Sequence, residues 1–336
     1  MSEQLHRFGI DAHLCGVLNM PPSAVPSGGR PAVIFITAGL LHKPGPFRLY
    51  VELSRTLAAM GIPALRFDLS GIGESGRSRT GESAEQSSVT DVREAMDSLA
   101  EELGTRRFVL TGLCSGAEVA HRAASQDTRV CAVVAMDGYM VRTPAYYWWH
   151  YLPRVFSARK WLDFAASKLQ RLRAGGRRRM ESTPEEEALA FWEGPGPDRD
   201  QLVMEFKSLC QRNVRQLQIF SGGSGDCSYE GQFRDAFKDV DFGELLDVCF
   251  FPEADHLYVL QTDRRRLLRT ITRWLGKHFI DETVPDSPRI SVPRSRQSDA
   301  AVFMPNVSSS MSNHASNSTS DNLSHSVKLA GRRHFE

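Results

Sequence analysis

Cysteine is scarce in this sequence, with six residues in a chain of 336, and no two of them form a CxxC pair. No Cys/His spacing typical of a zinc ligand set is present either. The six thiols are scattered, which is the usual pattern of a chain that stays reduced. These absences exclude a disulfide framework, predict no structural metal and favour a cytoplasmic location.

Long apolar runs are also missing, so no segment predicts a membrane-spanning helix. The first twenty residues lack the basic start and unbroken apolar core of a secretory signal. A formal net charge of +1 argues against general binding to nucleic acids. Neither a P-loop nor a GxGxxG motif occurs, so we expect no nucleotide cofactor, and no other cofactor is indicated.

What the sequence does contain is a regular alternation of strands and helices. An opening β-ribbon is predicted over 6–20, and short continuous apolar runs then alternate with amphipathic helical segments. Strands are expected at 31–39, 62–70, 106–112, 130–136, 215–223 and 245–252, and helices at 46–61, 88–103, 115–125, 229–237 and 257–279. This order predicts an α/β fold with a mostly parallel sheet that is covered by helices on both faces.

The alternation is interrupted once, and it stops before the end of the chain. Residues 138–213 hold four of the five tryptophans and predict a helical cap inserted into a core formed by 1–137 and 214–281. From 282 to 336 the sequence is rich in Ser, Asn and Pro without periodic apolar positions, which predicts a disordered tail.

The stretch "FVLTGLCSGAEVAHRAA" predicts a sharp turn between a strand and a helix, with Cys114 and Ser115 adjacent on it. A nucleophile on such a turn is exposed at a helix N-terminus, and the next backbone N–H can stabilise an oxyanion. The turn is crowded, so the residues two before and two after the nucleophile must be small. Gly112 and Gly116 satisfy this rule for Cys114, whereas Ser115 would place a leucine there. Cys114 is therefore the predicted nucleophile.

This turn resembles the nucleophile elbow of the α/β-hydrolase superfamily in its cysteine form, as in the dienelactone hydrolase family. The resemblance covers about residues 5–280, and "RFDLSGIGESG" is similar to the loop after the fourth strand of many hydrolases. The longer run 38–76 is similar to poorly characterised bacterial hydrolases, some of them associated with exosortase and exopolysaccharide systems. The family implies an α/β-hydrolase fold and a triad in the order nucleophile, acid, histidine.

The resemblance also implies the other members of the triad. His256 stands in "FFPEADHLY", past the last strand, where the family places its base. Asp226 follows the preceding strand in a turn that resembles the family's GxxD pattern, and is the predicted acid. Asp137, at the end of the strand over 130–136, is the alternative acid.

An oxyanion hole needs a second N–H, from the loop after the first parallel strand. The family usually has His-Gly-x in this loop, and this chain has Ala38-Gly39-Leu40. We therefore predict Leu40 N–H and Ser115 N–H as the donors. Substrate-pocket residues are expected at Gly39, His42, Tyr146 and Trp149, the last two from the aromatic cluster "YYWWHYL"; His150 of that cluster is a further candidate.

These residues predict a cysteine-dependent acyl hydrolase that acts on an ester or thioester with a large apolar portion. Acyl transfer or cyclisation by the same acyl-enzyme is an alternative, and so are a catalytically silent binding protein and a redox-sensing thiol. Between 150 and 180 the chain carries nine basic residues and one acidic residue. That run is either a solvated helix face or a docking surface for an acyl carrier protein, coenzyme A or a membrane surface.

Overall fold

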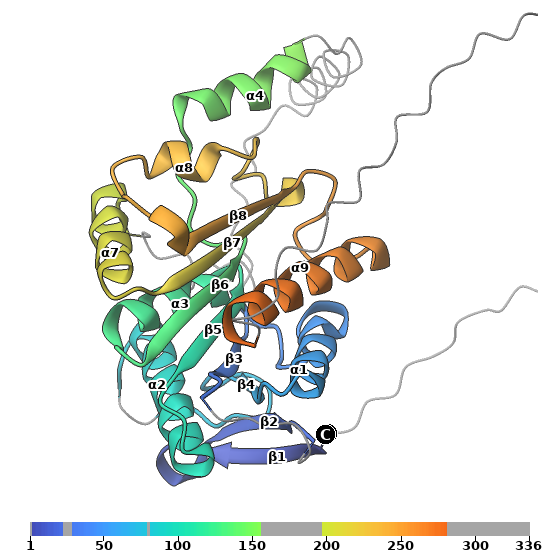
Figure 1. Cartoon of the computed structure of the whole chain (residues 1–336), viewed down its shortest axis with the longest axis vertical. Helices are drawn as coiled ribbons and strands as arrows, with labels where there is room; N and C mark the ends of the chain where they lie inside the picture. The colour runs from blue at the N-terminus through green and yellow to red at the C-terminus, as the bar shows by residue number, and fades with distance from the viewer. Residues whose placement is uncertain (1, 23–28, 79–80, 156–196, 281–336) are drawn as a thin grey trace, which may run out of the picture. The chain divides into compact units, whose positions relative to one another are not determined.

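The computed structural model describes residues 2–22, 29–78, 81–155 and 197–280, without the side chains of 150–155. Eight strands form one sheet in the order β1-β2-β4-β3-β5-β6-β7-β8 (Figure 1). Their bounds are β1 Ser2–Phe8, β2 Leu14–Met20, β3 Ala32–Ile36, β4 Ala64–Asp68, β5 Phe108–Leu113, β6 Val130–Met136, β7 Arg215–Ser221 and β8 Leu246–Phe251. The ribbon β1–β2 pairs antiparallel with itself and with β4, and all later pairings are parallel. This confirms the expected mostly parallel sheet.

Helices cover both faces of the sheet, as the continuous apolar strands require. In Figure 1, α1 and α9 lie on one face, and α2, α3 and α7 lie on the other. The bounds are α1 Leu49–Ala59, α2 Ala84–Leu103, α3 Ser115–Gln126, α4 Pro144–Val155, α7 Arg199–Gln211, α8 Gln232–Ala236 and α9 Gln261–Phe279. Each face has its own buried apolar cluster, one with α1 and α9 and the other with α2, α3, α7 and α8. No helix in the described part of the chain is long and apolar enough to cross a membrane.

The last helix starts later than its apolar pattern predicts. The carboxylate of Asp255 accepts hydrogen bonds from the N–H groups of Leu257 (2.9 Å) and Val259 (2.8 Å). These bonds hold residues 255–259 in a turn, and α9 begins only at Gln261. The consequence is that His256 lies on a loop that is anchored at the sheet rather than on the helix.

Helix α7 lies inside the range 138–213, where the sequence predicts a cap, yet it belongs to the core. Its residues Leu202, Val203, Phe206 and Leu209 are buried in the same cluster as α2 and α3. Helix α4 leads away from the sheet edge in Figure 1. Residues 156–196, which carry most of the predicted cap, and the predicted tail over 282–336 lie outside the described residues.

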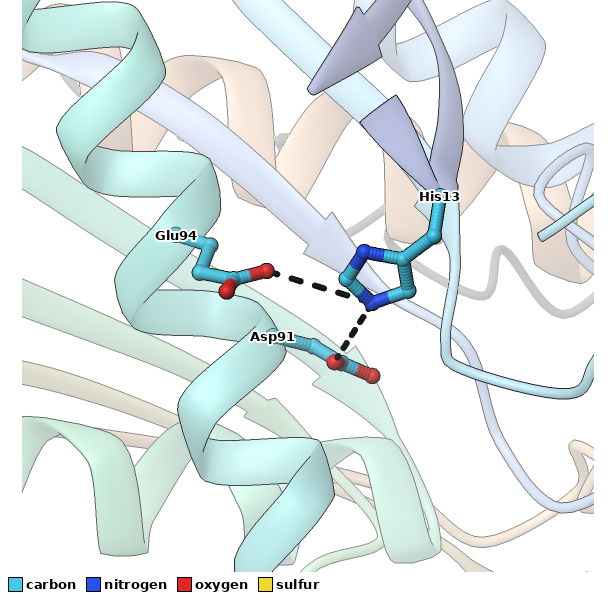
Figure 2. Close-up of side chains that lie close together, drawn as sticks. All are labelled: His13, Asp91 and Glu94. Atoms are coloured by element: carbon cyan, nitrogen blue, oxygen red, sulfur yellow. Dashed lines mark ion pairs between the residues drawn. The ribbon is translucent and has the colours of Figure 1, made fainter. Parts of the chain in front are cut away.

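Polar contacts fasten the ribbon to the body of the fold. Figure 2 shows His13, at the turn of the ribbon, facing Asp91 and Glu94 of α2. Its Nε2 lies 3.9 Å from the Asp91 Oδ1 and 4.0 Å from the Glu94 Oε2, and 3.2 Å from the hydroxyl of Ser70. Of the His/Cys/Asp/Glu groups in the described ranges, this is the one whose spacing could hold a metal ion.

Candidate active site

Cys114 sits on the one-residue turn between β5 and α3, in a backbone conformation that few residues other than glycine adopt. Its φ is 54° and its ψ is −126°, which is strained for a side chain with a Cβ. The predicted steric rule holds at both flanking positions. A Cβ on Gly112 would lie 2.2 Å from the carbonyl of Gly116, and a Cβ on Gly116 would lie 2.6 Å from the Ile36 carbonyl oxygen. The two glycines therefore let the strand and the helix meet at Cys114.

Tyr50 of α1 braces the strand end that leads into this turn. Its hydroxyl donates to the Ile36 carbonyl at 3.1 Å and accepts from the Leu113 N–H at 3.0 Å. The ring is 1% exposed, and burial raises the pKa of the Tyr50 hydroxyl, so the hydroxyl stays neutral and can donate. One side chain thus joins the ends of β3 and β5 directly before Cys114, a support that the sequence analysis missed.

His256 meets a carboxylate from the neighbouring strand end. Its Nδ1 lies 3.0 Å from the Oδ2 of Asp137, the residue that directly follows β6. Asp137 is held in turn by Ser221, whose N–H and hydroxyl donate to its two carboxylate oxygens at 2.6 and 2.7 Å. The Asp137 side chain is 1% exposed. A buried carboxylate with three hydrogen-bond partners has one fixed orientation, and it fixes the orientation of the imidazole.

The environment of His256 favours its protonated form. Its pKa is raised from 6.5 to about 10, chiefly by the hydrogen bond to Asp137 and then by the interaction with the Cys114 side chain, while burial opposes both. An imidazolium next to a thiol stabilises the thiolate, which is the reactive form of cysteine. His256 and Cys114 also line the same cavity.

Asp226, the predicted acid, is elsewhere. Its side chain is 54% exposed, and its Oδ1 accepts a hydrogen bond from the Arg142 guanidinium at 2.9 Å. The carboxylate beside His256 is that of Asp137, the alternative considered from the sequence. The reason lies in the glycines that suggested a GxxD turn. A Cβ on Gly223 would lie 2.6 Å from the Cα of Asp255, so Gly223 is needed for close packing against the His256 loop.

The loop after β3 approaches the first turn of α3. The N–H of Gly39 donates to the hydroxyl of Ser115 at 2.9 Å, so the Ser115 side chain holds this loop in place. The sequence pattern predicts only a backbone role for Ser115, and this side-chain contact adds a second one. The Ser115 N–H lies in the first turn of α3, where helix N–H groups have no intrahelical acceptor. In the described ranges no acceptor is found for the Leu40 N–H. Both predicted oxyanion donors therefore line the cavity with Cys114.

A cavity of about 770 Å³ opens at Cys114, His256, Gly39, Leu40 and Ser115. Much of its wall is apolar and comes from α3, α7 and the segment after β6. The apolar lining residues include Leu41, Leu113, Val119, Met140, Val141 and Leu202. A cavity of this size and composition suits a ligand with a sizeable apolar part.

Of the four predicted pocket residues, only Gly39 lines this cavity among the described residues. His42 is exposed, and its ring packs near Gly73. The Tyr146 hydroxyl donates to the Gly225 carbonyl at 2.7 Å, and Trp149 is 61% exposed with its ring stacked on that of Tyr229. Tyr146 and Trp149 therefore contact the segment after β7 instead. The side chain of His150 and the basic run to 180 lie outside the described residues.

Comparisons with known proteins bear on the class of this site. Residues 32–190 match the family model described as serine aminopeptidase, S33, and the match spans the turn at Cys114. A comparison with curated proteins finds no match.

Several solved structures are similar over most of the chain. The esterase Pf2001 of Pyrococcus furiosus is 16% identical with a TM-score of 0.55, and the match covers 83% of this chain and 91% of the esterase. The hypothetical protein PA2218 of Pseudomonas aeruginosa is 18% identical, with a TM-score of 0.52 and 82% and 94% coverage. The α/β hydrolase GrgF of Penicillium sp. sh18 is 19% identical, with a TM-score of 0.50 and 83% and 98% coverage.

At these identities the similarities show the fold, which is that of the α/β hydrolases. Together with the family match they support an enzyme of the α/β-hydrolase type.

Proposed function

We propose that this chain, an α/β-hydrolase fold, is a cysteine-dependent acyl hydrolase that cleaves esters or thioesters through a covalent acyl-enzyme. One observation carries the proposal: Cys114 and His256 line one cavity, and Asp137 holds His256 through its Nδ1. A thiol, an imidazole and a buried carboxylate that interact in this order form a catalytic triad for nucleophilic acyl transfer.

In the acylation step, the Cys114 thiolate adds to the carbonyl carbon of the substrate. The negative charge moves to the carbonyl oxygen, which accepts hydrogen bonds from the N–H groups of Ser115 and Leu40. The bond to the leaving oxygen or sulfur then breaks, and the leaving group takes the Nε2 proton of the His256 imidazolium. The products of this step are a Cys114 thioester, neutral His256 and a free alcohol or thiol.

In the second step, water adds to the thioester carbonyl and gives a proton to His256. The bond from the carbonyl carbon to Cys114 breaks, which releases the acid and restores the thiolate–imidazolium pair. An alcohol, an amine or a thiol can replace water in this step. Hydrolysis and acyl transfer therefore share the same acyl-enzyme and differ only in the acceptor.

The substrate class follows from the cavity and from the sequence. The apolar lining and the volume of about 770 Å³ favour an acyl group of medium length. The basic run between 150 and 180 supports an anionic carrier, either coenzyme A or an acyl carrier protein, and the reduced cysteines support a cytoplasmic location.

Intact-mass analysis after mixing with p-nitrophenyl octanoate tests the proposal. We expect the wild type to gain one octanoyl group on Cys114, with release of nitrophenolate. Cys114→Ala should form no adduct, because no other described non-glycine residue that lines the cavity has a strained backbone at a helix N-terminus. Adding a primary alcohol or amine during turnover then measures how the acyl group divides between water and another acceptor.

Ser115→Ala is the matched variant on the neighbouring residue. It should still be acylated at Cys114, at a rate lowered by about tenfold, because the Gly39 N–H loses its acceptor and the loop is held less firmly. An adduct on Ser115, or acylation of Cys114→Ala, would reject Cys114 as the nucleophile. Without any adduct and without nitrophenolate release, the chain would instead be a binding protein of this fold.

A further inference from the structure

Helix α3 turns one face toward the cavity, and this face carries three chemically active side chains. Cys114, Glu118 and Arg122 follow one another at intervals of four residues, and all three line the cavity. The N–H of Glu118 donates to the Cys114 carbonyl oxygen at 3.2 Å, which fixes Glu118 one turn above the thiol. The position of Glu118 relative to the thiol therefore depends only on the helix that starts directly after Cys114.

Arg122 is already paired, since its guanidinium forms an ion pair with the carboxylate of Glu85 at the rim of the cavity. Glu118 is different. Among the described residues, its carboxylate makes neither a hydrogen bond nor an ion pair, although Arg122 lies close enough to act on its charge. It is half-buried, and burial raises its pKa.

A half-buried carboxylate without a hydrogen bond is unfavourable, because it loses part of its water and gains no partner in exchange. Val119, Met140 and Leu202 are apolar and supply no donor to Glu118. The Tyr139 hydroxyl also lines the cavity, and burial and then the charge of Glu118 raise its pKa, but it makes no hydrogen bond among the described residues. None of the proposed chemical steps uses Glu118 either. We therefore expect the hydrogen-bond donor for the Glu118 carboxylate to belong to the molecule that occupies the cavity.

Building on the proposed function, we propose that Glu118 is a specificity-determining residue, whose carboxylate accepts a hydrogen bond from a hydroxyl or ammonium group on the acyl chain of the substrate. The preferred substrate is then an acyl ester or thioester that is largely apolar and carries one hydrogen-bond donor along its chain. A second carboxylate at the same place is repelled by Glu118.

The test compares thioesters of octanoate with thioesters that carry a hydroxyl or an amino group at carbon 3, 5 or 7, and with a thioester of octanedioate. For the wild type we expect kcat/KM to be about tenfold or more higher for at least one donor-bearing substrate than for octanoate. Octanedioate should be the poorest substrate. Glu118→Met should abolish the preference for the donor and relieve the discrimination against octanedioate.

Two further variants separate charge from hydrogen bonding. Glu118→Gln keeps an acceptor but loses the charge, so it should retain part of a hydroxyl preference and lose an ammonium preference. Glu101→Gln, an exposed carboxylate on α2, should keep every preference of the wild type. If Glu118→Met does not fold, the ammonium and octanedioate ratios of Glu118→Gln decide the question.

The experiments distinguish failure of the proposed role of Glu118 from failure of the proposed function. Acylation of Cys114 combined with substrate ratios that are equal in the wild type and the Glu118 variants rejects the role of Glu118 alone. The same conclusion follows if no donor-bearing substrate is preferred. Absence of acylation at Cys114 rejects the proposed function, and this inference with it.

Discussion

Asp137 shows how one residue depends on three separate elements. Its backbone has a φ of 48°, its N–H donates to the Ile219 carbonyl at 2.8 Å, and Ser221 of β7 donates twice to its carboxylate. The remaining contact goes to Nδ1 of His256, on the loop after β8. The strand ends of β6, β7 and β8 are therefore joined through this one carboxylate, which sets both the tautomer and the charge of the imidazole.

Asp137→Asn should lower the pKa of His256, because the carboxylate is the largest cause of its rise to about 10. The proposed thiolate–imidazolium pair exists only below that pKa, so the alkaline limb of kcat/KM should move to lower pH by more than one unit. We also expect the value at pH 7 to fall by about 100-fold, since the amide no longer stabilises the imidazolium. The measurement is a pH profile of thioester cleavage.

The pH dependence of protein stability is a second, independent test of the role of Asp137. A histidine whose pKa is raised from 6.5 to about 10 on folding contributes stability below pH 6.5, and this contribution is lost as the pH rises toward 10. Asp137→Asn should therefore lose the part of the pH dependence that lies in this window. Asp226→Asn is the matched control, because Asp226 is exposed and paired with Arg142. If Asp226→Asn shifts the kinetic profile more than Asp137→Asn does, the acid has been misassigned.

At the level of elements, the ribbon β1–β2 forms one edge of the sheet and needs side-chain contacts to stay there. Glu3 provides several of them. Its carboxylate accepts from Arg55 of α1 at 2.8 and 3.1 Å, from Asn19 of β2 at 2.9 Å and from Arg66 of β4 at 3.1 Å. These contacts, led by Arg55 and Asn19, lower the pKa of Glu3 from 4.5 to about 2. Three elements are thus linked to the edge strand through one side chain.

Glu3→Gln should lower Tm at pH 7 by about 2 °C, because three donors lose a charged acceptor and Arg66 is buried. A group whose pKa is lowered on folding stabilises the protein above its unfolded pKa of 4.5, and this contribution is lost as the pH falls toward 2. The difference in Tm between wild type and variant should therefore shrink over this window. Thermal unfolding followed by circular dichroism measures it, with Glu101→Gln as control. A difference that is the same at pH 7 and pH 2.5 would contradict an electrostatic origin.

At the level of the whole molecule, the body of the chain unites two segments that the predicted cap separates. Helix α7 lies within the predicted insertion, yet its Phe206 is 1% exposed and packs against Phe233, Phe237 and Phe242 at centroid distances of 5.5, 4.8 and 5.7 Å. The same ring lies 4.6 Å from that of His121 of α3. The last helix of the predicted insertion therefore shares one buried core with the segments on either side of it.

Phe206→Ala should cost about 3–5 kcal/mol of unfolding free energy, the range for removing a buried phenylalanine side chain. Because Phe206 is central to the shared core, the whole described body should be destabilised in a single transition. Met204→Ala, on the same helix but 65% exposed, should change stability by less than about 0.5 kcal/mol. Urea denaturation followed by fluorescence measures both values. A loss below 1 kcal/mol, or a separate early transition, would place α7 outside the core.

The sequence by itself determined the sheet, the turn at Cys114 and the position of His256 after the last strand, because these depend on local patterns. Short continuous apolar runs specify the strands and apolar positions with a period of 3.6 specify the helices, and the strand over 130–136 has the predicted bounds. Glycines are needed at 112 and 116 because the backbones of β5 and α3 come into contact there. This steric condition can be recognised from the five residues 112–116 alone.

Only the tertiary structure decided which carboxylate meets His256. Asp137 and Asp226 both follow parallel strands, so both reach the same edge of the sheet, and no local pattern separates them. The choice depends on the contacts of Ser221 with Asp137 and on the packing of Gly223 against the His256 loop, which join residues more than 30 positions apart. The same holds for the Ser115–Gly39 contact and for α7 in the core. Such long-range contacts follow from how the elements pack, and sequence periodicity carries no information about them.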